Sequence, residues 1–207
     1  MSQSDADHPK SAERDSPLPA DAATTPLNDA LDVDLPADVA SAFQTSLAAD
    51  RAPRSLADWI TLLDSFDDWP PAIADLCHSA DDGLHRADTP DQSFRFACVL
   101  DAMLLPFLHE AETTVTSRVP GSDDDLVFRV TDRGVTGSPD VVISFGAASR
   151  PPAGDVTPAH AYGTICPFIH TFPDTDSYED WAARVNGATT ALSLPDALGL
   201  AKAMTDV

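Results

Sequence analysis

A cysteine and an aspartate stand three residues apart in an otherwise mostly apolar stretch. The stretch runs from Phe94 to about Leu105 and contains Cys98 and Asp101. On a helix, residues at this spacing share a face, so the thiol and the carboxyl can approach each other. Burial would raise the pKa of the carboxyl and let it hold a proton near neutral pH. The pair suits nucleophile-plus-acid chemistry. The alternative is a free core cysteine and an aspartate at the solvent edge of its helix.

The other cysteines and the histidines form no pattern of their own. The three cysteines contain no C-x-x-C pair, which excludes zinc ribbons and thioredoxin-type motifs. Cys166 lies in a β-rich segment with His170 four residues on, and each alone is more typical of a structural residue. Cys77 is predicted to face the core. His78 and His85 have no partner pattern.

The first half of the chain divides into a tail and a helical lobe. Residues 1–34 carry few large apolar side chains, which predicts a disordered acidic tail. Residues 35–85 carry helical patterns: apolar residues at four-residue spacing from Val39, an N-cap at Ser55 and a third helix opened by the proline pair at 70–71. We therefore expect a lobe of three short helices.

In the second half of the chain, the spacing of apolar residues changes from a helical pattern to one typical of strands. After a polar connection over residues 81–92 and a helix over 94–105, four β-rich runs follow: TTVTSRV, LVFRV, VVISF and YGTICPFIHTF. A helix at Ser177, the strand TTALSL and a last helix at Pro195 complete the chain. Residues 86–207 therefore predict an α+β catalytic domain, with a mixed, mostly antiparallel sheet and flanking helices.

The charge limits the partners. Lys and Arg total 12 against 34 Asp and Glu, a net charge of −22. This disfavours nucleic acid and anionic membrane surfaces, which attract basic proteins. The chain has neither an apolar run of membrane-spanning length nor a secretory signal, which predicts a cytoplasmic protein with reduced thiols. The acids are dispersed and mostly Asp, and Lys occurs only at positions 10 and 202. This pattern is typical of halophilic proteins, whose charge is screened by molar salt; the alternative is an acidic surface for a basic partner.

Three segments resemble the organomercurial (alkylmercury) lyase family. Residues 94–109, FRFACVLDAMLLPFLH, are similar to its active-site helix, with Cys-x-x-Asp, an apolar stretch and a proline. Residues 164–184 resemble its second signature, and ATTALSLPDALGLAKAM its closing strand and helix. The resemblance covers about residues 94–204, and the helical lobe suits the family's winged-helix-like N-terminal part. Pro167 stands where many members have a second cysteine, and about Val119 replaces a further, structural one.

The resemblance implies protonolytic cleavage of the carbon–mercury bond of R–Hg⁺ to a hydrocarbon and Hg²⁺. Thiolates of Cys98 and Cys166 would hold the soft mercury ion. Asp101 would take a thiol proton and return it to the departing carbon. Small thiols or a mercuric reductase would then accept Hg²⁺, and neither an organic cofactor nor a resident metal is expected. Replacing Cys77 by serine should cost little activity.

Two functions of other classes stay open. One is a non-catalytic thiol protein of the same fold that binds or carries a soft metal such as mercury. The other is a winged-helix regulator, which the charge of −22 disfavours because DNA contact needs Lys or Arg. Asp101 separates a lyase from a carrier, since a carrier needs only the thiols.

Overall fold

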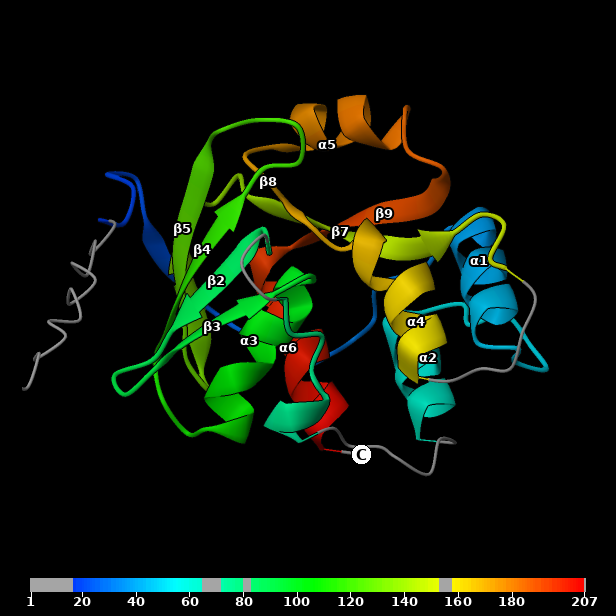
Figure 1. Cartoon of the computed structure of the whole chain (residues 1–207), viewed down its shortest axis with the longest axis horizontal. Helices are drawn as coiled ribbons and strands as arrows, with labels where there is room; N and C mark the ends of the chain where they lie inside the picture. The colour runs from blue at the N-terminus through cyan, green and yellow to red at the C-terminus, as the bar shows by residue number, and fades with distance from the viewer. Residues whose placement is uncertain (1–16, 65–71, 80–82, 153–157, 207) are drawn as a thin grey trace, which may run out of the picture.

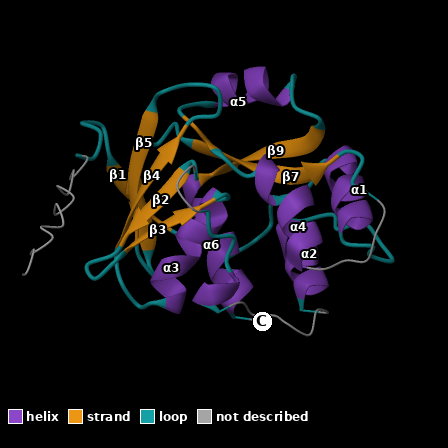
Figure 2. Ribbon diagram, viewed as in Figure 1, coloured by secondary structure: helices purple, strands orange, loops and turns teal. Residues whose placement is uncertain are grey.

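The computed structural model describes residues 17–64, 72–79, 83–152 and 158–206. The predicted α+β class is confirmed: helices pack on two antiparallel sheets (Figures 1 and 2). The helical elements are α1 (Ala37–Ser46), α2 (Leu56–Leu63), the 3₁₀ turn η1 (Ile73–Asp75), α3 (Val99–Leu108), α4 (Pro158–Thr164), the 3₁₀ turn η2 (Cys166–Phe168), α5 (Thr175–Ala182) and α6 (Leu194–Thr205). The strands are β1 (Ala23–Pro26), β2 (His85–Asp88), β3 (Ser93–Phe96), β4 (Thr113–Arg118), β5 (Asp125–Val130), β6 (Gly134–Gly137), β7 (Val142–Ala148), β8 (Thr171–Phe172) and β9 (Gly187–Ser193).

The two sheets enclose the central helices. The larger sheet has the order β1-β6-β5-β4-β2-β3, and the smaller has the order β8-β7-β9. Helices α3 and α6 pack against each other, and they contact strands of the larger sheet (Figure 2). Of the ten residues of α3, the eight from Val99 to Pro106 are buried, and all of these except Asp101 are apolar, as expected of a helix in the protein interior. This central position is what allows α3 to present a side chain to the interior.

The helix that carries Asp101 begins later than its sequence predicts. Residues 93–96 are not helical but form the edge strand β3, which pairs with β2 from Ser93↔Asp88 to Phe96↔His85. The segment Ser-Phe-Arg-Phe alternates polar and apolar side chains, which is the period of a strand. The predicted polar connection over 81–92 is also wrong in part, because β2 lies inside it, between β3 and β4.

The N-terminal elements are shorter and more integrated than predicted. The disorder prediction for residues 1–34 does not hold for Ala23–Pro26, which form β1 against β6. All four side chains of β1 are exposed, so main-chain pairing rather than apolar burial holds this edge strand, and hydrophobicity could not reveal it. Residues 1–16 lie outside the described part of the chain. The predicted third helix of the lobe is, where described, only the turn η1, closed by an Asp75 carboxylate that accepts the Ala72 N–H at 2.9 Å.

The helical lobe shares its core with the second half of the chain. Phe43 of α1, Trp59 of α2 and Phe145 of β7 pack in edge-to-face and tilted pairs with ring centroids 4.8–5.7 Å apart. Ser55 caps α2 as predicted, accepting the Asp58 N–H at 3.2 Å. The comparison of this lobe with a winged helix stays a prediction. Among the described residues, no helix combines the length and apolarity needed to cross a membrane.

Candidate active site

The two residues of the Cys-x-x-Asp motif lie at the start of α3. Cys98 is the N-cap residue and Asp101 lies in the first turn, so the pair is close although Cys98 is not within the helix. The Val99 N–H donates to the Ile169 carbonyl at 3.3 Å. This bond ties the start of α3 to the segment that follows Cys166.

Cys166 lies on a tight turn and not on the predicted strand. The run YGTICPFIHTF forms the end of α4, the turn η2 and the two-residue strand β8. Within η2, the Phe168 N–H donates to the Ile165 carbonyl at 2.9 Å, and Pro167 occupies the first turn, where its missing N–H costs nothing. The β-branched composition favoured a strand, but the turn is what brings Cys166 back toward α3.

Cys98, Asp101 and Cys166, which the resemblance groups in one site, line one cavity of the structure. The thiol of Cys166 lies near enough to the thiols of both Cys98 and Cys77 for each of them to raise its pKa. The sulfurs of Cys77 and Cys166 and a carboxylate oxygen of Asp101 all lie within 4.8 Å of one another. All three cysteines are free. Cys77, Asp101 and Cys166 therefore form one tight cluster, and Cys98 lies beside it next to Cys166.

Cys77 is the member of this cluster that the sequence analysis missed. It does pack against the core as expected, but it also reaches the other thiols. Its carbonyl accepts the Ala97 N–H at 3.0 Å, and its N–H donates to Asp101 Oδ2 at 2.8 Å. Because these contacts join segments 20 and more residues apart, no local pattern could have indicated them.

Burial governs the electrostatics of Asp101. Its side chain is 8% exposed, and desolvation raises its pKa from 3.8 to about 6. The hydrogen bond from the Cys77 N–H and the proximity of His78 oppose part of this rise. The carboxyl is therefore poised to gain and lose a proton near neutral pH.

The thiols of Cys77 and Cys166 differ in their affinity for a proton. The pKa of Cys166 is raised, chiefly because its S–H is held by hydrogen bonds to Cys77 and Cys98, and further by burial. The pKa of Cys77 is lowered, chiefly because its sulfur accepts the hydrogen bond from Cys166. Within this pair, a thiolate is favoured on Cys77.

A small apolar cavity opens onto the cluster. Its volume is about 110 Å³, and Cys98, Asp101 and Cys166 line it. Its other lining residues are mostly apolar and include Trp59, Leu63, Leu76, Leu100, Leu104, Ile165, Ile169 and Met204. At its edge the Tyr162 hydroxyl donates to the Asp75 carbonyl, linking α4 to the turn η1. Such a cavity suits a small apolar group attached to an atom that the thiols bind.

Comparison with known protein families assigns the chain to one of them. The family model for alkylmercury lyases matches residues 79–206, more than half of the chain. The chain belongs to the alkylmercury lyase family. As such it is an enzyme of the organomercurial lyase class. The matched region contains Cys98, Asp101 and Cys166, whereas Cys77 lies two residues before it.

Two further comparisons concern solved structures and curated proteins. A solved structure similar to this lyase is the mercury-bound form of MerB2, with 14% sequence identity and a TM-score of 0.47. The similarity covers 83% of this chain and 92% of that chain. Nothing among the curated proteins matches the chain.

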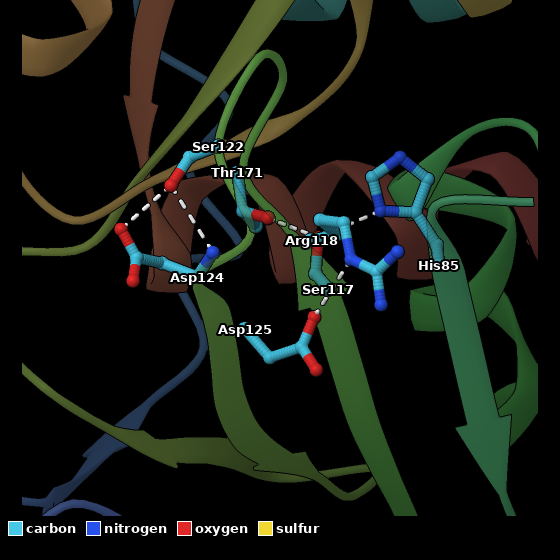
Figure 3. Close-up of polar contacts among 7 residues, drawn as sticks. All are labelled: His85, Ser117, Arg118, Ser122, Asp124, Asp125 and Thr171. Atoms are coloured by element: carbon cyan, nitrogen blue, oxygen red, sulfur yellow. Dashed lines mark hydrogen bonds and ion pairs between the residues drawn. The ribbon is translucent and has the colours of Figure 1, made fainter.

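A buried polar network in this lyase holds the turn that carries Cys166. His85 Nε2 lies 3.2 Å from His170 Nδ1, and His170 Nε2 lies 2.9 Å from the carbonyl of Pro167. His85 Nδ1 bonds Ser117 Oγ at 2.7 Å, and Ser117 in turn bonds Thr171; Figure 3 shows Ser117 between the two. The network runs from β2 and β4 to His170 and to Thr171, the first residue of β8. His85, for which the sequence showed no partner, is therefore a positioning residue for η2.

The turn is held from a second side by β7. Ser144 Oγ donates to the Phe168 carbonyl at 2.9 Å and accepts the His170 N–H at the same distance. Ser144 is fully buried, so both bonds are shielded from water. The segment after Cys166 is thus held through its backbone by β7 and through the side chains of His170 and Thr171 by β2 and β4.

Both histidines of the network should make the stability of this lyase depend on pH. Burial lowers the pKa of His85 and of His170, so the folded protein keeps both rings neutral below pH 6.5, where the unfolded chain protonates them. Stability should therefore fall as pH drops below 6.5, by up to about 2.7 kcal/mol per pH unit for two rings. Urea unfolding of the wild type and of His170→Gln between pH 7.5 and 5 tests this, with a shallower dependence expected for the variant.

The matched control is His109→Gln, at the C-terminal end of α3 and outside the network. Ionisation of Asp101 changes stability in the opposite direction over part of the same range, so the informative quantity is the difference between each variant and the wild type. Equal pH dependence in the wild type and His170→Gln would show that His170 is not held neutral by the fold.

Proposed function

We propose that this protein cleaves the carbon–mercury bond of organomercurials by protonolysis, giving a hydrocarbon and Hg²⁺. The observation that carries the proposal is the buried Asp101 carboxyl beside clustered thiols at an apolar cavity. The thiols suit a soft metal ion, and the carboxyl suits a proton that must be delivered in a water-poor site.

The reaction balances with the residues present. One thiol, Cys98 or Cys166, displaces the weak ligand of R–Hg⁺ and loses its proton to solvent. The second thiol passes its proton to Asp101 as its sulfur binds mercury, which increases the electron density on the metal and weakens the carbon–mercury bond. The Asp101 carboxyl then protonates the departing carbon. The bonds lost are carbon–mercury and sulfur–hydrogen, those gained are sulfur–mercury and carbon–hydrogen, and mercury stays divalent.

Asp101 favours a lyase over a mercury carrier. A carrier needs only soft ligands. In a carrier, a carboxyl with 8% exposure would lower the stability of the fold without contributing to mercury binding. A pKa of about 6 suits a group that must accept a proton from a thiol and then release it. The alternative, a thiol protein of the same fold that binds mercury without turnover, is the second candidate because the thiols alone suffice for it.

The proposal includes the surroundings of the reaction. We expect that neither an organic cofactor nor a resident metal takes part, and that free thiols are needed as co-reactants to remove Hg²⁺. The acceptor would be a small thiol or a mercuric reductase in the cytoplasm, where the thiols of the site stay reduced.

The deciding experiment supplies methylmercury or phenylmercury to the purified full chain with excess small thiol at about molar salt. Methane or benzene is measured by headspace gas chromatography, and Hg²⁺ by its transfer to the thiol. A control holds protein whose thiols were first alkylated with iodoacetamide. Hydrocarbon formation over many turnovers is expected. Stoichiometric binding of the mercurial without hydrocarbon would identify a carrier instead.

We further propose that the acid excess adapts the protein to high salt. At a net charge of −22, repulsion between the acidic side chains opposes folding. Raising the salt from about 0.1 M to about 1 M shortens the Debye length from roughly 10 Å to roughly 3 Å and screens this repulsion. The near-UV circular dichroism of the folded chain should therefore be present at the higher salt and lost at the lower. Activity assays in dilute buffer would then report a false absence of turnover.

Sucrose is the control for the salt effect, because it favours compact states without screening charge. It should restore less structure than KCl does. An identical melting temperature at both salt concentrations would contradict the halophilic interpretation and favour a surface built for a basic partner.

A further inference from the structure

The thiol of Cys77 has no task in the reaction above, although it belongs to the same cluster. Its sulfur lies within 4.8 Å of both the Cys166 sulfur and a carboxylate oxygen of Asp101. A residue that only filled core space would not need a thiol at this point.

The geometry suits one ion shared by several sulfurs. Metal–sulfur bonds are about 2.3 Å for zinc, so two sulfurs on one ion lie up to about 4.6 Å apart, and mercury is larger. Cys166 has both Cys98 and Cys77 as neighbouring thiols. An ion bound between Cys98 and Cys166 is therefore within reach of a third thiol after a small movement.

The backbone holds Cys77 in this position. Its carbonyl accepts the Ala97 N–H, one residue before Cys98, at 3.0 Å. Its N–H donates to Asp101 at 2.8 Å. Two hydrogen bonds thus fix Cys77 to Asp101 and to the residue just before Cys98, and neither depends on the side chain of residue 77.

Exposure distinguishes Cys77 from the other two thiols. Cys98 is 2% exposed and Cys166 8%, whereas Cys77 is only partly buried. Mercury exchanges between thiols by attack of an incoming sulfur on the bound metal. A ligand on the more exposed side therefore lies between the ion and an external thiol, and slows the transfer.

We propose that Cys77 is a third mercury-binding thiol, which joins Cys98 and Cys166 on the Hg²⁺ product and holds it until an external thiol removes it. This inference rests on the proposed function for the origin of the ion but concerns the product state alone. It assigns a role to a residue outside the region that the family model matches.

The step balances without an oxidant. Once Asp101 has protonated the carbon it is a carboxylate again. The Cys77 sulfur then donates an electron pair to mercury, its S–H bond breaks, and the proton passes to that carboxylate within 4.8 Å. One sulfur–mercury and one oxygen–hydrogen bond form, one sulfur–hydrogen bond is lost, and mercury stays divalent.

The test loads the full-length protein with one equivalent of HgCl₂ at high salt and measures the sulfur neighbours of mercury by X-ray absorption. Three sulfurs are expected in the wild type and two in Cys77→Ser. In parallel, Hg²⁺ should protect all three cysteines from iodoacetamide in the wild type, as read by peptide mass spectrometry. Transfer of Hg²⁺ to added glutathione should be about tenfold faster from Cys77→Ser.

Two sulfurs in the wild type, or Cys77 alkylated equally fast with and without Hg²⁺, would overturn the proposal. Cys77→Ala is the second variant: it keeps the backbone hydrogen bond to Asp101, so a change shared with Cys77→Ser comes from the thiol. Because HgCl₂ replaces the organomercurial, the result is independent of cleavage. Three sulfurs without hydrocarbon formation would reject the proposed function and retain this site, whereas two sulfurs with turnover would do the reverse.

Discussion

Replacing either deeply buried thiol, Cys98→Ser or Cys166→Ser, should lower the rate of carbon–mercury cleavage by about 10³-fold or more. Oxygen is a poor ligand for a soft ion, so each variant leaves mercury with one fewer thiolate at the moment the carbon must leave. Both residues line the cavity, and their sulfurs are in contact. Single-turnover release of benzene from phenylmercury at high salt measures the effect without interference from Hg²⁺ release.

Cys77→Ser is the matched control for these two variants. It removes one thiol from the same cluster, yet single-turnover cleavage should change by less than about threefold, because Cys77 acts only on the product. Near-UV circular dichroism checks that all three variants fold. The reverse pattern, with Cys77→Ser inactive and Cys166→Ser active, would show that the reacting thiol pair was assigned wrongly.

Asp101→Asn should keep the mercurial bound and slow its protonolysis by about 10²–10⁴-fold. An amide fills the same space beside the Cys77 N–H, but it cannot pass a proton from a thiol to carbon. Rapid mixing with phenylmercury separates the two events: thiol consumption reports binding, and benzene reports cleavage. Loss of both together would indicate that Asp101 binds mercury or supports the fold rather than delivering the proton.

The same variant should be more stable than the wild type at alkaline pH. Burial favours the protonated Asp101, so its contribution to stability is fully present below pH 3.8 and is lost as pH rises through about 6. Above pH 6, burial of the ionised carboxylate lowers the free energy of unfolding by about 3 kcal/mol. Urea unfolding should show Asp101→Asn gaining stability over the wild type between about pH 4 and pH 6.5, and keeping that advantage at higher pH. A constant difference would mean that Asp101 does not titrate in this range.

The unfavourable burial of Asp101 explains why this site residue could be recognised in the sequence more easily than its neighbours. Active-site residues commonly oppose the stability of the fold that holds them. Asp101 stood out in the sequence because it is an ionisable residue in an apolar helix. Because its neighbours on that helix are apolar and buried, Asp101 is buried with them.

Features set by neighbouring residues could be predicted from the sequence. Alternating β-branched residues gave β4 and β5, Pro195 marked the start of α6, and Ser55 marked the start of α2. The Cys-x-x-Asp spacing placed Cys98 and Asp101 together even though Cys98 is the N-cap rather than a helical residue. Capping, turn and strand preferences act within a few residues, so a linear pattern records them.

Only the tertiary structure decided which distant segments complete the site. The bond from the Cys77 N–H to Asp101 spans 24 residues, and the contact between His85 and His170 spans 85. The turn at Cys166 replaced a predicted strand because bonds from Ser144 and His170 hold its carbonyls, and no local preference encodes them. A single sequence records the composition of such contacts but not their pairing, which is set by how α3 and the two sheets pack. The third thiol of the cluster was therefore present in the sequence from the start but acquired its place only through the fold.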